Sequence, residues 1–191
     1  MTPAGTSAMD DAAMTADATI HPLVLQLRFT RREFLRGVRG VNDEDGAVRL
    51  GPMNCIAWNV GHLAWQEQRY FVSIGQERTP YPDVAAAYEY GAPGSTPRLR
   101  DTLAAWKAIT AEADPWLDTL TSELLAETPI RRGKPLATTF GNRIQRTIYH
   151  YWFHTGENLA IRQSLGHRRL PEFVGAIDTE APYVPERGAR P

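Results

Sequence analysis

The sequence predicts an all-α fold: a four-helix bundle with long loops and an extended C-terminal arm. Two observations favour it. Four segments carry apolar residues at helical spacing, and no alternating strand pattern extends beyond a few residues. The 191 residues fit one domain, so we expect a disordered tail over residues 1–18, the bundle over 19–170 and the arm over 171–191.

The first two expected helices cover residues 19–38 and 54–75. Pro22 suits the first turn of the former, where its missing N–H costs nothing. Asn54 is the expected N-cap of the latter, and Gly75 is the expected residue just past its end. The first helix has its apolar stripe at Leu23, Leu27, Phe34 and Val38. The second is apolar or aromatic around much of its circumference, which indicates burial on several sides.

The third helix is expected to be capped by Ser95 or Thr96, with a kink at Pro115, because its apolar spacing resumes beyond that proline. The fourth is expected to run from Phe140 to Gly166. The connection over residues 79–97 is long for a helical bundle, and loops of this length often line functional sites. Residues 121–138 read as irregular.

The charge, the cysteine content and the distribution of apolar residues limit which partners and which cellular location we expect for the protein. With 21 basic and 22 acidic residues, the net charge of -1 gives no general attraction to nucleic acid or to an anionic membrane. The single cysteine, Cys55, excludes an internal disulfide, fits a reducing compartment and reads as a small buried thiol. No apolar stretch has the length of a membrane span, and the first eighteen residues lack the pattern of a signal peptide. We therefore expect a cytoplasmic protein.

His150 and His154 lie four residues apart in the fourth helix, so both imidazoles face one side. His62 is the lone histidine of the second helix, and it can complete a three-histidine metal site with an open coordination position. The alternative is a hydrogen-bonded core pair or a chance pair on the surface. The motif of zinc proteases is excluded, because Tyr151 stands where that motif needs glutamate.

Polar residues beside the histidines are the candidate catalytic residues. Glu157 and Asn158 share the face of His154, and either could orient an imidazole or contact a metal-bound water. Gln66, one turn after His62, is the second candidate, whereas Glu67 is less well aimed. The alternative for Glu157 is a solvated carboxylate or an ion pair with Arg162.

Arg131 and Arg132 form a short basic cluster with Lys134. We predict that the two arginines help to bind a cofactor or substrate through an anionic group. The alternative is a solvated loop. His21 and His167, at a helix start and just past a helix end, are not predicted ligands.

The segment NVGHLAWQEQRYF, followed about ninety residues later by HYWFHTGENLAIRQSLGH, resembles the DinB/YfiT-like superfamily of metalloenzymes. The closing LPEFVGAIDTEAPY is similar to its actinobacterial branch, and the resemblance spans about residues 20–183. It implies a bundle with up-down-down-up topology and the metal ligands His62, His150 and His154. Members include thiol S-transferases that use bacillithiol, mycothiol or glutathione, and a mycothiol-dependent maleylpyruvate isomerase. Relatives often dimerise, so a homodimer is among the expectations.

The leading hypothesis is therefore a metal-dependent thiol S-transferase. A divalent metal, most simply Zn²⁺ with Ni, Fe or Co as alternatives, activates a low-molecular-weight, mycothiol-like thiol against a small electrophile. The alternatives are a non-catalytic metal-binding stress protein and a non-haem Fe(II) enzyme. A related domain binds iron in ergothioneine sulfoxide synthases, but those enzymes have a second catalytic domain that 191 residues cannot hold. The expected partners are small molecules, without nucleic acid or membrane.

Overall fold

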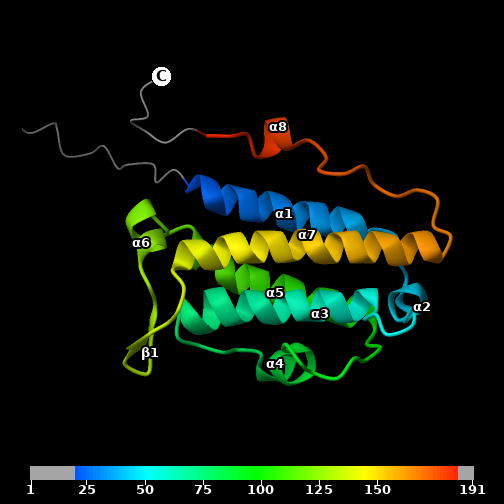
Figure 1. The fold of residues 1–191 in the computed structure, drawn as a ribbon, viewed down its shortest axis with the longest axis horizontal. Helices are drawn as coiled ribbons and strands as arrows, with labels where there is room; N and C mark the ends of the chain where they lie inside the picture. Colours follow the sequence, from blue (N-terminus) through cyan, green and yellow to red (C-terminus); the bar gives the residue numbers. More distant parts are fainter. Residues whose placement is uncertain (1–19, 185–191) are drawn as a thin grey trace, which may run out of the picture.

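Four long helices lie side by side in the protein, as a computed structural model that describes residues 20–184 shows (Figure 1). They are α1 (Pro22–Val38), α3 (Ile56–Glu67) with its continuation η1 (Gln68–Ile74), α5 (Leu99–Leu117) and α7 (Phe140–Ser164). α1 packs against α7, and α3 packs against α5. The predicted all-α class is confirmed. The expected disordered tail, residues 1–18, lies outside the described residues, as do residues 185–191 of the expected arm.

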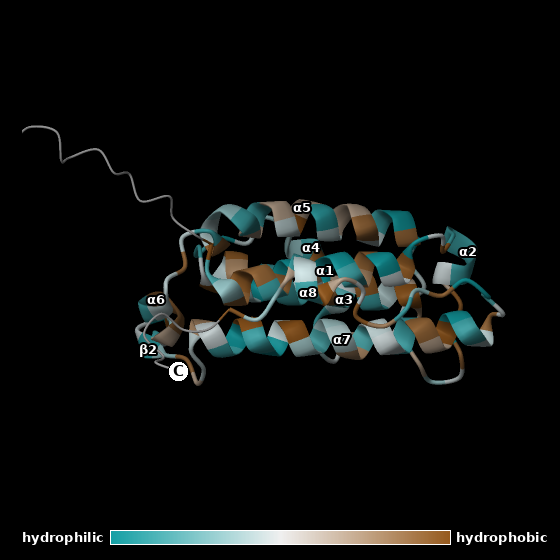
Figure 2. Cartoon of the chain, turned by 90° about the horizontal axis from the view of Figure 1, so that it is seen from above, coloured by the Kyte–Doolittle hydropathy of each residue, from teal (hydrophilic) through white to brown (hydrophobic). Residues whose placement is uncertain are grey.

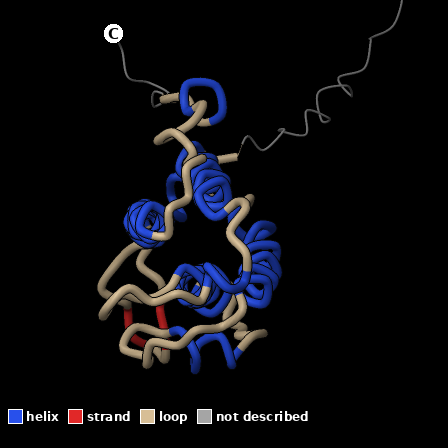
Figure 3. The backbone as a smooth tube through the Cα atoms, turned by 90° about the vertical axis from the view of Figure 1, so that its right-hand side faces the viewer, coloured by secondary structure: helices blue, strands red, loops and turns tan. Residues whose placement is uncertain are grey.

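Short elements occupy the connections between the long helices. Figure 3 shows the two strands at the edge of an otherwise helical molecule, and Figure 1 shows the last element lying along α1. These elements are α2 (Asp43–Gly46), α4 (Pro82–Tyr88), α6 (Ser122–Ala126), β1 (Ile130–Arg131), β2 (Lys134–Pro135) and α8 (Ile177–Glu180). The strands pair antiparallel in a two-residue hairpin. Residues 121–138, which were expected to be irregular, thus contain the short helix α6 and the hairpin of β1 and β2.

The core is built from the apolar faces of the four long helices. Apolar and polar residues alternate along α5 and α7, as amphipathic packing requires (Figure 2). Phe34 of α1 packs edge-on against Tyr151 of α7, with ring centroids 5.2 Å apart, and Trp106 of α5 contacts both rings, at 6.3 Å from Phe34 and 6.5 Å from Tyr151. α3 is buried at each of its twelve residues, which confirms that this helix is covered on several sides.

A buried polar network links the four long helices. Arg31 of α1 donates Nε–H and Nη2–H to the two carboxylate oxygens of Glu67 in α3, at 2.8 and 2.6 Å. The Tyr151 hydroxyl of α7 donates to Glu67 at 2.8 Å and accepts from Trp106 Nε1 of α5 at 2.6 Å. Arg31 also bonds Asp114 of α5 at 2.6 Å. Because Glu67 and Tyr151 are fully buried, removing one partner would leave another unsatisfied in the core.

Several predicted helix boundaries are corrected. α1 begins at Pro22, where the His21 side chain accepts from the Leu23 N–H. Cys55, and not Asn54, caps α3. α5 begins at Leu99 after Arg98, with no side-chain cap, so the predicted Ser95 or Thr96 cap is wrong.

The ends of the second and third helices also differ from the prediction. α3 changes into a π-helix at Gln68, whereas an unbroken α-helix was expected to Gly75. α5 ends at Leu117, two residues after Pro115, and Leu120 is buried from the turn beyond it. The apolar spacing therefore continues past Pro115 at Leu117, the last residue of the helix, and at Leu120, which a turn carries back to the core.

Candidate metal centre

Three histidine side chains from two neighbouring helices meet at one point. His150 and His154 lie one turn apart on α7, and His62 comes from α3. Their ring centroids are 4.5 Å apart for His150 and His154, 5.0 Å for His62 and His150, and 5.5 Å for His62 and His154. One nitrogen of each ring lies within 4.8 Å of the others. The structure therefore brings together the three residues predicted as ligands.

His62 is held by a backbone carbonyl. Its Nδ1 lies 2.7 Å from the carbonyl oxygen of Tyr88, the last residue of α4. A carbonyl oxygen only accepts, so Nδ1 carries the hydrogen and Nε2 keeps its lone pair. Gly61 permits this approach, because a Cβ built there would lie 2.7 Å from the Tyr88 ring. The long connection expected to line a site thus supplies one of its hydrogen bonds.

The two histidines of α7 are oriented by side-chain oxygens. His150 Nδ1 donates to Gln66 Oε1 at 2.9 Å, and His154 Nδ1 donates to Glu157 Oε2 at 2.6 Å. Asn59 of α3 also donates to Glu157, at 3.3 Å. Oxygen acceptors at Nδ1 fix the ring tautomer and raise the basicity of a metal-binding imidazole. Gln66 and Glu157, the predicted catalytic residues, thus lie where they position the imidazoles.

The free nitrogens of His150 and His154 lie at a separation that suits a shared metal ion. Nε2 of His150 and Nε2 of His154 face each other at 2.9 Å. With both Nδ1 atoms protonated, two lone pairs meet at this distance, and a cation bound by both relieves their repulsion. A divalent metal about 2.0–2.1 Å from each nitrogen holds neighbouring nitrogens roughly 3.0–3.4 Å apart, close to this separation. The three-histidine cluster therefore fits a divalent metal site.

Burial favours the neutral form of the His62 and His150 imidazoles, which is the form that binds metal. It lowers the pKa of His62, outweighing the hydrogen bond to the Tyr88 carbonyl. Burial, reinforced by the neighbouring His154 and His62 rings, lowers the pKa of His150 to about 3. A protein that folds with these rings uncharged does not have to displace protons from His62 and His150 when metal binds near neutral pH.

Comparison with known proteins places the chain in a family. A family model of the DinB superfamily matches residues 26–157, a range that covers more than half of the chain and contains all three histidines. The chain belongs to the DinB superfamily. The comparison with curated proteins gave no match. Among the helices between residues 20 and 184, none is long and apolar enough to cross a membrane.

Aromatic rings cover the imidazoles of this DinB superfamily member. Trp58 and Trp65, one helical turn before and after His62, stack on its ring with centroids 4.9 and 5.2 Å away. Phe153 contacts the His154 ring edge-on at 5.1 Å. Both tryptophans are buried, so water is excluded from the ring faces while the Nε2 edges stay turned toward one another. The local dielectric is therefore low, which strengthens electrostatic interactions at the centre.

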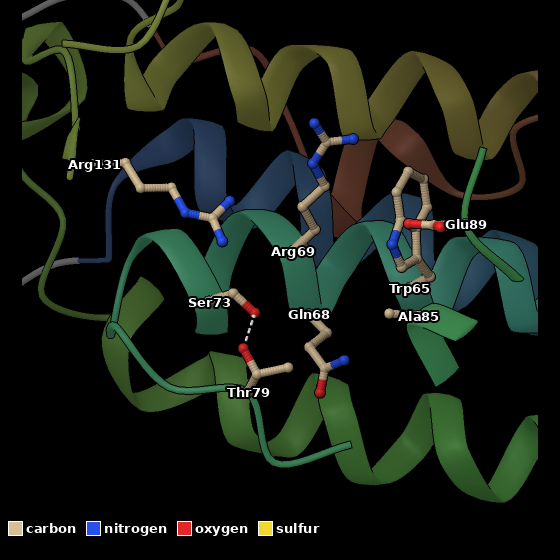
Figure 4. Close-up of a pocket in the computed structure, with 8 residues that line it drawn as sticks. All are labelled: Trp65, Gln68, Arg69, Ser73, Thr79, Ala85, Glu89 and Arg131. Carbon is tan, nitrogen blue, oxygen red and sulfur yellow. Dashed lines mark hydrogen bonds between the residues drawn. The ribbon is translucent and has the colours of Figure 1, made fainter. Parts of the chain in front are cut away.

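The two arginines predicted to bind a cofactor are placed differently. Arg131 lines a cleft of about 330 Å³ together with Trp65 and Arg69 (Figure 4). Arg132, the next residue, is exposed in the hairpin turn with φ at 52° and does not line that cleft. A tight turn points successive side chains in different directions, so the two arginines do not act as one cluster.

The cysteine and the two histidines that were not predicted as ligands lie away from the centre. Cys55 is buried at the start of α3 and donates its thiol hydrogen to the Ser95 carbonyl at 3.4 Å, which confirms a buried thiol. His21 caps α1, and His167 contacts Asp45 at 3.2 Å beyond the end of α7. Neither histidine belongs to the three-histidine cluster.

Two positioning contacts were missed by sequence reasoning. The Tyr88 carbonyl is a backbone group, and no side-chain pattern reveals it. Asn59 lies three residues before His62 on the same helix face, a spacing that could have indicated it. Asn158 was expected to orient an imidazole or to contact a metal-bound water. It accepts from Asn59 Nδ2 at 2.9 Å and bonds no imidazole in the described residues, while its contact with a metal-bound water stays a prediction.

Proposed function

We propose that this DinB superfamily protein is a metal-dependent thiol S-transferase that joins a low-molecular-weight, mycothiol-like thiol to a small electrophile. One observation carries the proposal: His62, His150 and His154 present free Nε2 atoms to one point, and oxygen acceptors hold each Nδ1. Three imidazoles with an open position are typical of catalytic zinc sites, whereas structural sites are closed by a fourth protein ligand. The resemblance to thiol-transferring relatives supports the choice of thiol chemistry.

The reaction converts a thiol RSH and an electrophile R′–X into RS–R′ and HX. The C–S bond forms as the C–X bond breaks, X leaves with the bonding electron pair, and the thiol proton passes to solvent. A bound divalent metal would supply a position at which the thiol ionises. Since a free thiol has a pKa of about 8.5, complete ionisation at pH 7 raises the thiolate concentration about thirtyfold.

The chain's own residues prepare this centre. Gln66 and Glu157 hold the imidazole rings in one tautomer, and Asn59 holds the Glu157 carboxylate. The negative charge of Glu157 strengthens His154 as a donor. The stacked tryptophans exclude water that would compete with the thiol. The proposed partners are the thiol and the electrophile, in the cytoplasm, where the single cysteine would stay reduced.

Elemental analysis of protein purified without a histidine tag tests the metal site. We expect about one divalent metal ion per chain, lost in His150→Ala and retained in His167→Ala, because His167 lies outside the centre. Equal metal content in the wild type and His150→Ala would contradict the site. The matched control also reports whether removing any histidine lowers metal content through general destabilisation.

Conjugation assays test the reaction. Metal-loaded protein is mixed with chlorodinitrobenzene and with glutathione, bacillithiol or mycothiol in turn. We expect conjugate that depends on metal with at least one thiol. No turnover with any of the three, together with tight metal uptake, would favour the metal-binding stress protein, and O₂-dependent product would favour the Fe(II) enzyme.

A further inference from the structure

A polar cleft adjoins the three-histidine centre. Its volume of about 330 Å³ is at the lower end of the range for small-molecule sites. Trp65 is shared by both features, since its ring stacks on His62 and also lines the cleft. The lining comes from α3, η1, α4, the segments that flank α4, and the hairpin (Figure 4). The residues are Trp65, Gln68, Arg69, Ser73, Thr79, Ala85, Glu89 and Arg131.

Most of the uncharged polar groups in this cleft already have partners. The Gln68 amide donates to the Tyr81 carbonyl at 2.9 Å and accepts from the Tyr81 N–H at 2.8 Å. The Ser73 and Thr79 hydroxyls bond each other at 2.9 Å. The charged lining groups are the guanidinium groups of Arg69 and Arg131 and the exposed carboxylate of Glu89, so positive charge prevails.

A third guanidinium group adds to this charge from inside the bundle. Arg143 of α7 is 7% exposed, and its Nε has no hydrogen-bond partner. Its guanidinium group lies 5.0 Å from the centre of the Tyr70 ring, and that of Arg69 lies 5.8 Å from the same ring. Burial lowers the pKa of Arg143, and the positive charges of Arg69 and Arg146 act in the same direction.

These arginines have no counter-ion in the part of the chain that the structure describes. Over residues 20–184, no ion pair involves any of the four arginines Arg69, Arg131, Arg143 and Arg146. A buried guanidinium group without an anion is costly, and it gains stability when an anion binds nearby. That cost applies to Arg143, whereas Arg69 and Arg131 are exposed; neither forms an ion pair with Glu89, so both guanidinium groups are free to bind an anion.

The backbone at this point is also unusual. η1, the π-helix over Gln68–Ile74, carries Arg69 and Tyr70 together with Ser73. π-Helices are rare and occur frequently at functional sites, where they redirect side chains. The departure from α-helical spacing at Gln68 begins one residue before Arg69.

We propose that this cleft is an oxyanion subsite, in which Arg69 and Arg131 bind a carboxylate or phosphate group of a small-molecule ligand. Guanidinium groups suit both anions because they can donate two parallel hydrogen bonds. Arg143 contributes positive potential, because its guanidinium group contacts the same Tyr70 ring as that of Arg69. The inference rests on the proposed function, since the ligand is the thiol or the electrophile of that reaction. Its anionic group would bind in the cleft, and its reacting end would extend past Trp65 to the three histidines.

Calorimetric titration of succinate and of inorganic phosphate into the metal-free protein tests the subsite. We expect wild-type protein to bind at least one anion, and Arg69→Gln and Arg131→Gln to weaken its affinity at least about tenfold each. Arg132→Gln is the matched control, because that neighbour lies outside the cleft, and it should bind as wild type does. Tighter succinate binding assigns a carboxylate, and tighter phosphate binding assigns a phosphoryl group. Failure of wild type to bind either anion, or equal weakening by Arg132→Gln, would overturn the subsite.

Metal uptake by the same variants separates this inference from the proposed function. Because neither Arg69 nor Arg131 bonds an imidazole, both variants should take up metal as wild type does. If the protein binds no metal but binds an anion through these arginines, the subsite is supported and the proposed transferase activity is refuted. Metal-dependent transfer with an anionic electrophile should show a KM raised at least about tenfold in Arg69→Gln with kcat nearly unchanged. An unchanged KM for every anionic thiol and electrophile would overturn the subsite alone.

Discussion

Substitution of Gly61 by alanine should lower metal affinity without removing a ligand. The new Cβ would lie 2.7 Å from the Tyr88 ring, whereas ordinary van der Waals contact begins at 3.4 Å. The ring must therefore retreat by about 0.7 Å, and the rest of Tyr88 is drawn with it. The carbonyl oxygen of the same residue now accepts from His62 at 2.7 Å. A retreat of this size would lengthen that contact to about 3.4 Å, where little hydrogen bonding remains.

The expected loss follows from the role of that hydrogen bond. Removing the partner of a metal-binding imidazole typically weakens metal affinity by about 10–100-fold, which corresponds to roughly 1.4–2.7 kcal/mol. The fold should survive, because alanine favours an α-helix over glycine by up to about 1 kcal/mol and this gain offsets part of the crowding. Competition with a chromophoric chelator measures the zinc affinity, and thermal unfolding measures the stability.

Gly156→Ala is the matched control. Gly156 lies in α7 beside the site residues, but a Cβ there meets no atom within 4 Å. It should raise stability by about 0.5–1 kcal/mol and leave zinc affinity unchanged. Zinc affinity of Gly61→Ala equal to that of wild type would refute the assignment of Tyr88 as an orienting partner. An equal loss in both variants would show that the effect comes from the glycine change itself.

Three further predictions concern the core, the pH response and the carboxylate. Tyr151→Phe removes the hydroxyl that bonds Glu67, so it should lower the free energy of unfolding in urea by about 1–3 kcal/mol; no loss would contradict the network. The pKa of His150 falls from 6.5 to about 3 on folding, so the unfolded chain binds more protons between these values. The free energy of unfolding of the metal-free protein should therefore fall as the pH falls from 6.5 to about 3, and His150 should cause no pH dependence above that range. Denaturant titrations at several pH values measure this dependence. Glu157→Gln keeps an acceptor for His154 but loses its charge, so zinc affinity should fall about tenfold at unchanged melting temperature, and an unaltered affinity would show that the charge is irrelevant.

The helices and the three histidines were predictable because their signals are local and periodic. A four-residue spacing on one helix places His150 and His154 on one face whatever surrounds them. His62 followed from being the one histidine on a neighbouring apolar helix. Gln66 and Glu157 followed from their distance of one turn from a histidine. In each case the geometry of an α-helix alone determines the direction of the side chain.

The features that were missed depend on contacts between distant segments. Glu67 was judged less well aimed at the histidines, and nothing in its neighbourhood reveals that Arg31 approaches it from another helix. The change to a π-helix at Gln68 likewise follows no composition rule in the sequence. The Tyr88 carbonyl became part of the site only through the position of α4. Tertiary packing decides these features, and a local pattern cannot encode it.

The buried polar network and the hydrogen bonds of the three-histidine cluster both fix how α3 lies against α7. Gln66 and Glu67 are consecutive on α3, and they bond His150 and Tyr151, which are consecutive on α7. A slip of one turn would move one helix about 5.4 Å along the other, break the contacts of both pairs and carry His62 away from its partners. The charge buried at Glu67 makes that slip expensive, since the carboxylate would lose its partners in the core. The register of the two helices, and with it the spacing of the three imidazoles, is thus held in part by Glu67 and Tyr151, which lie outside the three-histidine cluster.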